Sequence, residues 1–271
     1  MANVISLKEA IGGFVHDGDS VALEGFSHLI PFAAGHEIIR QRRRDLTLIR
    51  LVPDLIFDQM IGMGCARKLI FSWAGNPGVG LLHRFREAVE KGWPCPLALE
   101  EHTHGSLAAA YAAGAARLPF GTMRGYPDTD LAERTTAVVA IQCPFTGEKL
   151  AAVRAIHPDV TIIHAQRADK DGNVQLWGIQ GVQKEAVYAA RSVIVTVEGI
   201  CEKFEPVVSG TVIPSWIVSA IVVAPGGARP SYAHGYYPRD NAFYQEWDAI
   251  SRDRRRFIEW IDQNVMECVQ A

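Results

Sequence analysis

The 271-residue chain contains 27 Lys and Arg and 30 Asp and Glu, which gives a formal net charge of -3 at pH 7. Hydrophobic residues make up 48% and charged residues 21%, a composition typical of a globular protein and too apolar for a disordered one. The near balance of charge leaves no basic field to hold a polyanion, so nucleic acid is not expected as a partner.

The N-terminal part of the chain alternates between helical and strand patterns. Ser6 and Glu9 have capping-box spacing, and apolar residues at helical spacing follow them, which predicts a first helix. The apolar run SVALEG predicts a first strand that ends at Gly25. The same rhythm then predicts, in chain order, a helix at 31–43, a strand at 46–52, a helix at 54–62, a strand at 68–73, a helix at 81–90, a strand at 97–99 and a helix at 103–116. Strands separated by long helices indicate a parallel sheet covered on both faces.

The pattern changes after residue 137. Two short apolar runs at 137–153, separated by PFTGEK, predict an antiparallel hairpin at the edge of the sheet. The alternation resumes with strands at 159–165, 192–198 and 217–223, a helix at 182–191, and two amphipathic helices at 241–265 that break near Ser251. Because no linker or repeat interrupts the chain, residues 1–271 are predicted to form a single α/β domain. Its open, mostly parallel sheet is flanked by helices and carries a small antiparallel insertion.

Cysteine usage and the N-terminal segment favour a cytoplasmic protein. The chain has no CxxC spacing, which argues against a zinc ribbon and a disulfide scaffold. The cysteines are Cys65, Cys95, Cys143, Cys201 and Cys268. The start of the chain lacks the pattern of a signal peptide, and no run of about 18 apolar residues occurs. We therefore expect a cytoplasmic protein with no metal and no membrane contact.

Ligands of an open parallel sheet bind beyond the carboxyl ends of its strands, where the glycine-rich loop AGNPGVG lies. Its backbone amides, around Asn76 and Gly78, could cradle a phosphate or a carboxylate at the start of a helix. Alternatively, the glycines only permit a tight turn. A dinucleotide site with Glu100 as the ribose-binding acid is a third interpretation, but the glycine spacing is not GxGxxG.

The segment EEHTHG places carboxylates and imidazoles at another predicted strand end. Glu101, His102 and His104 could bind a metal, although no further ligand is in view. Glu101 or His102 could also contact substrate or act as a general acid or base. The remaining alternative is that Thr103 simply caps the following helix.

Two further loops carry reactive or charged side chains. Ser27 and His28 lie in GFSHLIP, but the chain contains no GxSxG motif, so a serine hydrolase is disfavoured. His164 at a strand end is better explained as a core residue than as a ligand contact. Arg229 in APGGARPS could grip an anionic group. The residues by themselves indicate an α/β protein that binds a small anionic ligand, and they name no reaction.

Several segments are familiar from one family. DGDSVALEGFSHLIP resembles the first signature of the alpha subunits of class I coenzyme A transferases, in which an apolar strand usually runs into GGF. Here Glu24 replaces the first glycine. AGNPGVG, LPFGTMRGYPDTDL, CPFTGEKLAAV, HAQRADKDGNVQLWG and APGGARPSYAHGYYPRDN look like the corresponding segments of the glutaconate CoA-transferase branch. The resemblance covers nearly the whole chain.

The resemblance implies a heteromeric enzyme whose alpha and beta subunits share a similar open α/β fold and form the active site between them. In that family a beta-subunit glutamate attacks the acyl-CoA and passes through an acyl anhydride to a glutamyl-CoA thioester. The implied reaction moves CoA from succinyl-CoA to a short dicarboxylic acid such as 3-oxoadipate. No cofactor is implied beyond the coenzyme A thioester, which is substrate, and no catalytic residue is assigned to this chain.

The resemblance further implies that this chain holds the acyl group and excludes water, because the intermediates are easily hydrolysed. The candidate substrate-binding residues are Gly25, Phe26, Ser27, His28, Asn76, Gly78, Glu101 and His102. Glu24 could repel an anionic substrate or mark altered chemistry. The alternatives are an acyl-CoA hydrolase or decarboxylase on the same scaffold, including enzymes that open steroid-derived rings, and a non-catalytic anion-binding protein.

Overall fold

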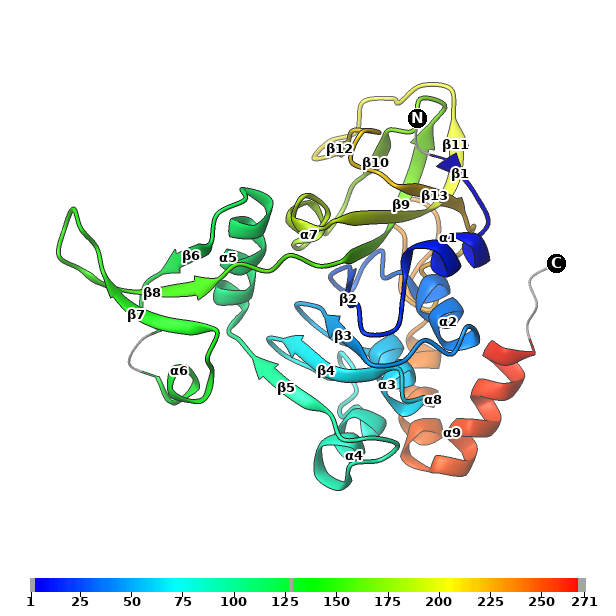
Figure 1. Ribbon diagram of the computed structural model, residues 1–271. Coiled ribbons are helices and arrows are strands. Elements are labelled where there is room, and N and C mark those ends of the chain that lie inside the picture. Colours follow the sequence, from blue (N-terminus) through cyan, green and yellow to red (C-terminus); the bar gives the residue numbers. More distant parts are fainter. Residues whose placement is uncertain (1–2, 127–128, 268–271) are drawn as a thin grey trace.

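The computed structural model describes residues 3–126 and 129–267, and Figure 1 shows their arrangement. A long, wholly parallel row of strands runs through the main body. Its order across the sheet is β1 (Asn3–Val4), β13 (Ala220–Val223), β11 (Ser192–Cys201), β9 (Val160–Asp169), β2 (Ser20–Glu24), β3 (Leu46–Ile49), β4 (Ala66–Phe71) and β5 (Ala98–Glu101). Two short antiparallel strands, β10 (Val174–Leu176) and β12 (Thr211–Ile213), extend the sheet beside the end of β9.

The strand order reverses between β2 and β9. From β2 the chain proceeds outward through β3 and β4 to β5, whereas from β9 it proceeds in the other direction through β11 to β13. At such a reversal the connections after the two strands leave in opposite directions and open a crevice beyond their carboxyl ends. The crevice here is bordered by the residues that follow Glu24 and by the end of β9.

Helices cover both faces of the sheet. One face carries α1 (Leu7–Phe14), α2 (Phe32–Arg40), α3 (Leu55–Gly62), α4 (His83–Lys91), α8 (Asn241–Arg252) and α9 (Arg254–Ile261), which continues into a π-helical turn, η1 (Asp262–Met266). The other face carries α5 (His104–Ala115) and α7 (Gln183–Ala189). Strand β2 serves both cores because side chains alternate along a strand. Ala22 packs with Leu107 and Tyr111 of α5, while Leu23 packs with the α2 side.

A second, small sheet stands apart from the main body (Figure 1, left). It consists of β6 (Phe120–Met123), β8 (Lys149–Arg154) and β7 (Val138–Gln142), all antiparallel, with α6 (Asp130–Arg134) beside it. The predicted hairpin is therefore present as β7 and β8. Its predicted position at the edge of the main sheet was wrong, because β8 pairs with β6 instead, and the four residues of β6 carry too short a pattern to be recognised.

The fold class predicted from the sequence is confirmed. The capping box forms as expected, with the Ser6 Oγ accepting from the Glu9 amide at 3.2 Å. The C-terminal helices separate at Asp253, not at Ser251, because the Asp253 carboxylate accepts the Arg256 amide and starts α9. Within the described part of the chain, no helix is both long and apolar enough to cross a membrane.

The cysteines that the structure describes are all free thiols. They are Cys65, Cys95, Cys143 and Cys201. Cys268 lies outside the described residues.

Candidate functional site

The loop after β2 borders the crevice and packs tightly against itself. A Cβ atom added to Gly25 would lie 2.7 Å from both the His28 and the Leu29 carbonyl oxygens, so only glycine fits. The next turn places Ser27 at a φ of 57° and Leu29 at 52°, in the left-handed region that side chains rarely adopt. This loop is therefore held in a strained, specified shape beside the sheet, as functional loops often are.

His28 is fully buried in the loop and is bonded at both ring nitrogens. Its Nδ1 lies 3.0 Å from the Ile179 carbonyl oxygen, and its Nε2 accepts from the His234 amide at 2.9 Å. A carbonyl needs a donor and an amide needs an acceptor, so the proton sits on Nδ1 and the ring is neutral. Burial lowers the pKa of His28 to about 4, in agreement with that state. His28 ties three segments together and is not poised to transfer a proton.

Phe26 reaches the other helical face of the sheet. Its ring meets that of His104 edge to face, with 6.4 Å between ring centroids. Gly181 approaches from the opposite side, since a Cβ there would lie 2.8 Å from the Phe26 Cβ. The contact brings the loop after β2 next to the start of α5, although β3 and β4 separate β2 from β5 in the sheet.

Glu24, which stands where the family signature usually has glycine, is turned into the protein and is only 2% exposed. Its Oε1 accepts from the Leu51 amide at 3.0 Å and from the Tyr111 hydroxyl at 2.9 Å. Burial raises the pKa of Glu24 to about 7, although the charge of Arg50 and these hydrogen bonds oppose the rise. The carboxyl group thus lies below the crevice, where it links β2, β3 and α5.

Arg50, fully buried at the end of β3, was not singled out in the sequence. Its Nη1 pairs with the Asp54 carboxylate at 2.9 Å, and its Nη2 donates to the Gly25 carbonyl at 2.8 Å. An arginine in a short apolar run reads as a surface residue. The available signal was Asp54 four residues later, at the start of a predicted helix.

The EEHTHG segment divides between an exposed and a buried carboxylate. Glu101 is exposed at the end of β5, whereas Glu100 pairs with Lys68 at 2.7 Å and with Arg154 at 3.3 Å. Burial raises the pKa of Glu100, but hydrogen bonds from His102 and Lys68 outweigh it and bring the pKa down to about 2. Glu100 is therefore an ion-pair partner, which argues against a ribose-binding role.

His102 is buried between two side chains and does not face His104 across a metal site. Its Nε2 lies 3.0 Å from Glu100 and its Nδ1 lies 3.3 Å from the Ser106 hydroxyl. Thr103 caps α5 as the sequence predicts, with its Oγ1 accepting the Ser106 amide at 3.1 Å. No group of three or more potential metal ligands gathers among the described residues.

The glycine-rich loop does not offer a free helix start. The Asp58 Oδ1 accepts the Arg84 and Phe85 amides of α4 at 2.8 and 2.9 Å, which are the amides an anion would use. Asn76 is buried, and its Nδ2 donates to the Tyr244 carbonyl at 2.7 Å, toward α8. Gly78, with φ of 80°, has open space around it and supplies a turn.

A second buried network holds the far side of the crevice. His164, fully buried as predicted, bonds to the Thr196 hydroxyl at 2.8 Å and to the Glu198 carboxylate at 2.7 Å. Glu198 also accepts from the Tyr237 hydroxyl and from the Gly226 amide. Burial opposes ionisation, but these hydrogen bonds outweigh it and lower the pKa of Glu198. Glu198 was missed because it simply ends a predicted strand.

The structure thus sorts the predicted site residues into two groups. Gly25, Phe26, Ser27 and His28 lie at the reversal of strand order, and the contact of Phe26 with His104 places the start of α5 beside them. Asn76 points away from this group, toward α8.

The fold defines an α/β protein whose ligand crevice lies at the strand-order reversal. A family model described as coenzyme A transferase matches residues 4–224, so the chain belongs to the coenzyme A transferase family. Its open parallel sheet and this match together identify it as a chain of a CoA-transferring enzyme.

Similar proteins share almost the full length. The chain is 58% identical to the alpha subunit of 3-oxoadipate CoA-transferase of Pseudomonas knackmussii, over 98% of this chain and 94% of that one. It is 35% identical to the alpha subunit of glutaconate CoA-transferase of Acidaminococcus fermentans, over 96% and 88%. The crystal structure of glutaconate coenzyme A-transferase from the same organism matches with a TM-score of 0.90, covering 99% and 90% of the chains at 31% identity. A variant of the decarboxylase AibA/AibB matches with a TM-score of 0.82, covering 96% and 98% at 31% identity.

Proposed function

We propose that this chain is the alpha subunit of a heteromeric enzyme that moves CoA from succinyl-CoA to a short dicarboxylic acid of the 3-oxoadipate type. The observation that carries the proposal is the 58% identity to the corresponding chain of 3-oxoadipate CoA-transferase, which extends over nearly the whole length. The partner is a beta subunit that completes the active site. The enzyme needs no cofactor, because the coenzyme A thioester is itself the substrate, and it works in the cytoplasm.

The nucleophile is a glutamate of the beta subunit. Its carboxylate attacks the thioester carbonyl and releases the CoA thiolate, which leaves an acyl anhydride. The thiolate then attacks the glutamyl carbonyl, frees the donor acid and forms a glutamyl-CoA thioester. The acceptor carboxylate reverses these two steps and regenerates the glutamate. Every step exchanges a carboxylate for a thiolate, so no net proton transfer is required.

The state of this chain's own carboxyl groups supports that assignment. Glu24, Glu100 and Glu198 each lie at a strand end, but each is tied to internal hydrogen-bond or ion-pair partners. Turning Glu24 inward also keeps its carboxyl group off the crevice surface, which an anionic acid must approach. The chain thus contributes a shaped, weakly charged wall at the loop after β2.

Trapping of the covalent intermediate tests the transferase assignment. Incubation of the assembled complex with succinyl-CoA, followed by borohydride reduction or mass measurement, should mark one glutamate of the beta subunit while this chain stays unmodified. Exchange of label between succinate and succinyl-CoA should accompany the adduct. A covalent adduct on this chain, or exchange with no adduct on either chain, would contradict the proposal.

Glu101 is the exposed carboxylate at the end of β5, next to the group around Phe26. If it positions the acyl group, Glu101→Gln should lower the turnover of the transfer reaction about tenfold while the complex still assembles. Glu90→Gln removes an exposed carboxylate on α4 and serves as the matched control. Steady-state kinetics of both variants decide the point, since unchanged turnover in Glu101→Gln leaves that residue without a role in the reaction.

A second candidate is hydrolysis or decarboxylation of an acyl-CoA on the same scaffold. The close structural match to the decarboxylase AibA/AibB favours it. The two reactions differ in what they need, because transfer stops without an acceptor acid whereas hydrolysis and decarboxylation continue. Release of free CoA or carbon dioxide from acyl-CoA alone would therefore favour the second candidate.

A further inference from the structure

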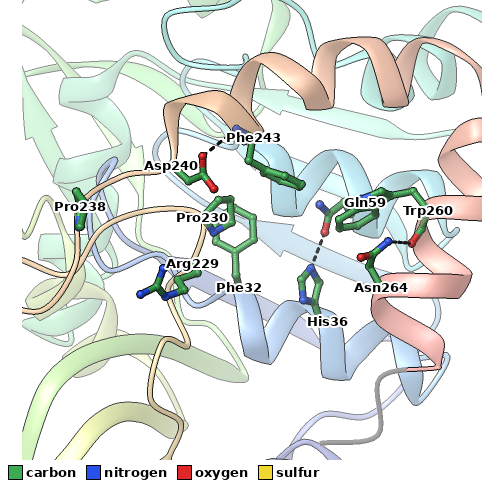
Figure 2. Close-up of a pocket in the computed structure, with 10 residues that line it drawn as sticks. All are labelled: Phe32, His36, Gln59, Arg229, Pro230, Pro238, Asp240, Phe243, Trp260 and Asn264. Atoms are coloured by element: carbon green, nitrogen blue, oxygen red, sulfur yellow. Dashed lines mark hydrogen bonds between the residues drawn. The ribbon is translucent and has the colours of Figure 1, made fainter.

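A pocket separate from the crevice lies between α2, α8 and α9 and has a volume of about 230 Å³ (Figure 2). Its walls are mainly rings and prolines, contributed by Phe32, Pro230, Pro238, Phe243 and Trp260. An apolar cavity of about 150 Å³ accommodates benzene. The pocket therefore has room for a flat apolar body of about one substituted ring.

A buried amide without a full set of partners lines this pocket. Gln59 is fully buried, and its Oε1 lies 2.8 Å from the Nε2 of His36 (Figure 2). Burial lowers the pKa of His36 to about 4, so the ring is neutral and donates from Nε2 to this oxygen. The Nε2 of Gln59 has no hydrogen-bond partner. Leaving a buried donor unpaired costs roughly 1–3 kcal/mol, which an acceptor oxygen on a ligand would recover.

An exposed guanidinium stands at the other end of the pocket. Arg229 forms no ion pair with a carboxylate in the described part of the chain, and its guanidinium lies over the Tyr237 ring, 4.4 Å from the centroid. Tyr237 is fixed in turn by its bond to Glu198. The carboxylate that lines the pocket, Asp240, is occupied as the cap of α8, where it accepts the Phe243 amide at 3.0 Å. Arg229 is thus presented for an outside anion, and guanidinium groups favour carboxylates.

We propose that this pocket binds a small carboxylic acid with a flat apolar body, its carboxylate at Arg229 and an acceptor oxygen on the body at Gln59. The site lies in the helical layer, whereas Phe26 and the crevice face α5. It belongs to this chain by itself, so binding requires neither acyl-CoA nor the catalytic glutamate of a partner.

Ligand titration tests the proposal on the full chain, together with its partner subunit where the two co-purify. The probe is para-acetylbenzoate, which joins a carboxylate, a ring and a carbonyl oxygen, and acetophenone is the analogue without charge. Calorimetry or ligand-observed NMR should show that the acid binds and that acetophenone binds about tenfold more weakly. No binding of the acid at millimolar concentrations would overturn the proposal.

Matched variants assign the two contacts. Arg229→Met should weaken para-acetylbenzoate about tenfold, whereas Arg255→Met, which removes an exposed cation from α9, should leave its affinity unchanged. Gln59→Met should weaken para-acetylbenzoate but not benzoate, which lacks the carbonyl oxygen. Equal affinities in Arg229→Met and the wild type, or in Gln59→Met and the wild type for para-acetylbenzoate, would overturn the corresponding assignment. Thermal melts confirm that each variant is folded, and CoA transfer need not be measured.

Discussion

At the residue scale, the group formed by Glu24, Arg50 and Asp54 places two carboxyl groups and one guanidinium out of contact with water. Three buried charges of this kind cannot all be neutralised in pairs, so one carboxyl group is favoured to hold a proton. Arg50 pairs directly with Asp54, while Glu24 receives two neutral hydrogen bonds. Tyr244 also lies within reach of Asp54, at 3.4 Å. The proton is therefore assigned to Glu24.

This assignment predicts a pH dependence of stability. The pKa of Glu24 rises from 4.5 to about 7 on folding, chiefly through burial, so the folded chain holds the additional proton between these values. The contribution of Glu24 to the free energy of unfolding is full below pH 4.5 and falls as the pH rises toward 7. Glu24→Gln keeps an acceptor oxygen and has no charge to gain. Thermal melts between about pH 5 and pH 8 should show a smaller loss of stability in Glu24→Gln than in the wild type, and parallel curves would contradict the assignment.

Gly25 gives a second residue-scale prediction. Gly25→Ala would force a methyl group to within 2.7 Å of two carbonyl oxygens and should cost about 1–3 kcal/mol of unfolding free energy. Gly13→Ala, at a position with no atom within 4 Å, should be neutral or stabilising. Chemical denaturation of both variants makes the comparison. A loss in Gly25→Ala no larger than that in Gly13→Ala would mean that the loop is free to move.

The sequence indicated some of these roles and not others. Gly25 and Thr103 could be predicted because a glycine after a strand and a threonine before a helix have local signatures. The burial of Glu24 and Arg50 could not, because it depends on which strands become neighbours. Asn76 was grouped with the wrong residues for the same reason, since its partner Tyr244 lies 168 residues away along the chain.

At the scale of elements, Asp58 joins three helices from a buried position in α3. Besides the two amides at the start of α4, its Oδ2 accepts from the Trp247 indole of α8 at 3.1 Å. The helix starts that carry local capping signals were predicted from the sequence, whereas the start of α4 is satisfied by a side chain from another helix. The predicted anion cradle at this helix arose from that missing tertiary contact.

Asp58→Ala should therefore destabilise the chain more than loss of a local cap does. It leaves three donors unpaired in the core, which should cost about 3 kcal/mol or more, whereas Thr103→Ala should cost about 1 kcal/mol. Denaturant titrations of the two variants give the comparison. Equal losses would indicate that water or a backbone shift replaces Asp58.

At the scale of the whole molecule, burial is unevenly distributed between the two sheets. Nearly all residues of β9 are buried and its neighbours pair along much of its length, while β7 is a mostly exposed edge strand with Val139 59% exposed. Opening of a segment costs less where fewer apolar side chains are buried. Hydrogen exchange should therefore be slowest in β9 and β11 and fastest in β7. Uniform protection across both sheets would show that a partner or a second copy covers the small one.

The small sheet has a narrow attachment to the body. The Ala155 amide donates to the Pro119 carbonyl, and Phe120 pairs with Arg154, so the chain departs and returns at one place. Residues 119–155 therefore resemble a cassette whose two ends are already joined by hydrogen bonds. A protein engineer could exchange this cassette between relatives without changing the strand order of the body. The exchange would have to preserve Gly121, because the cassette rests there directly on the backbone of Ala109.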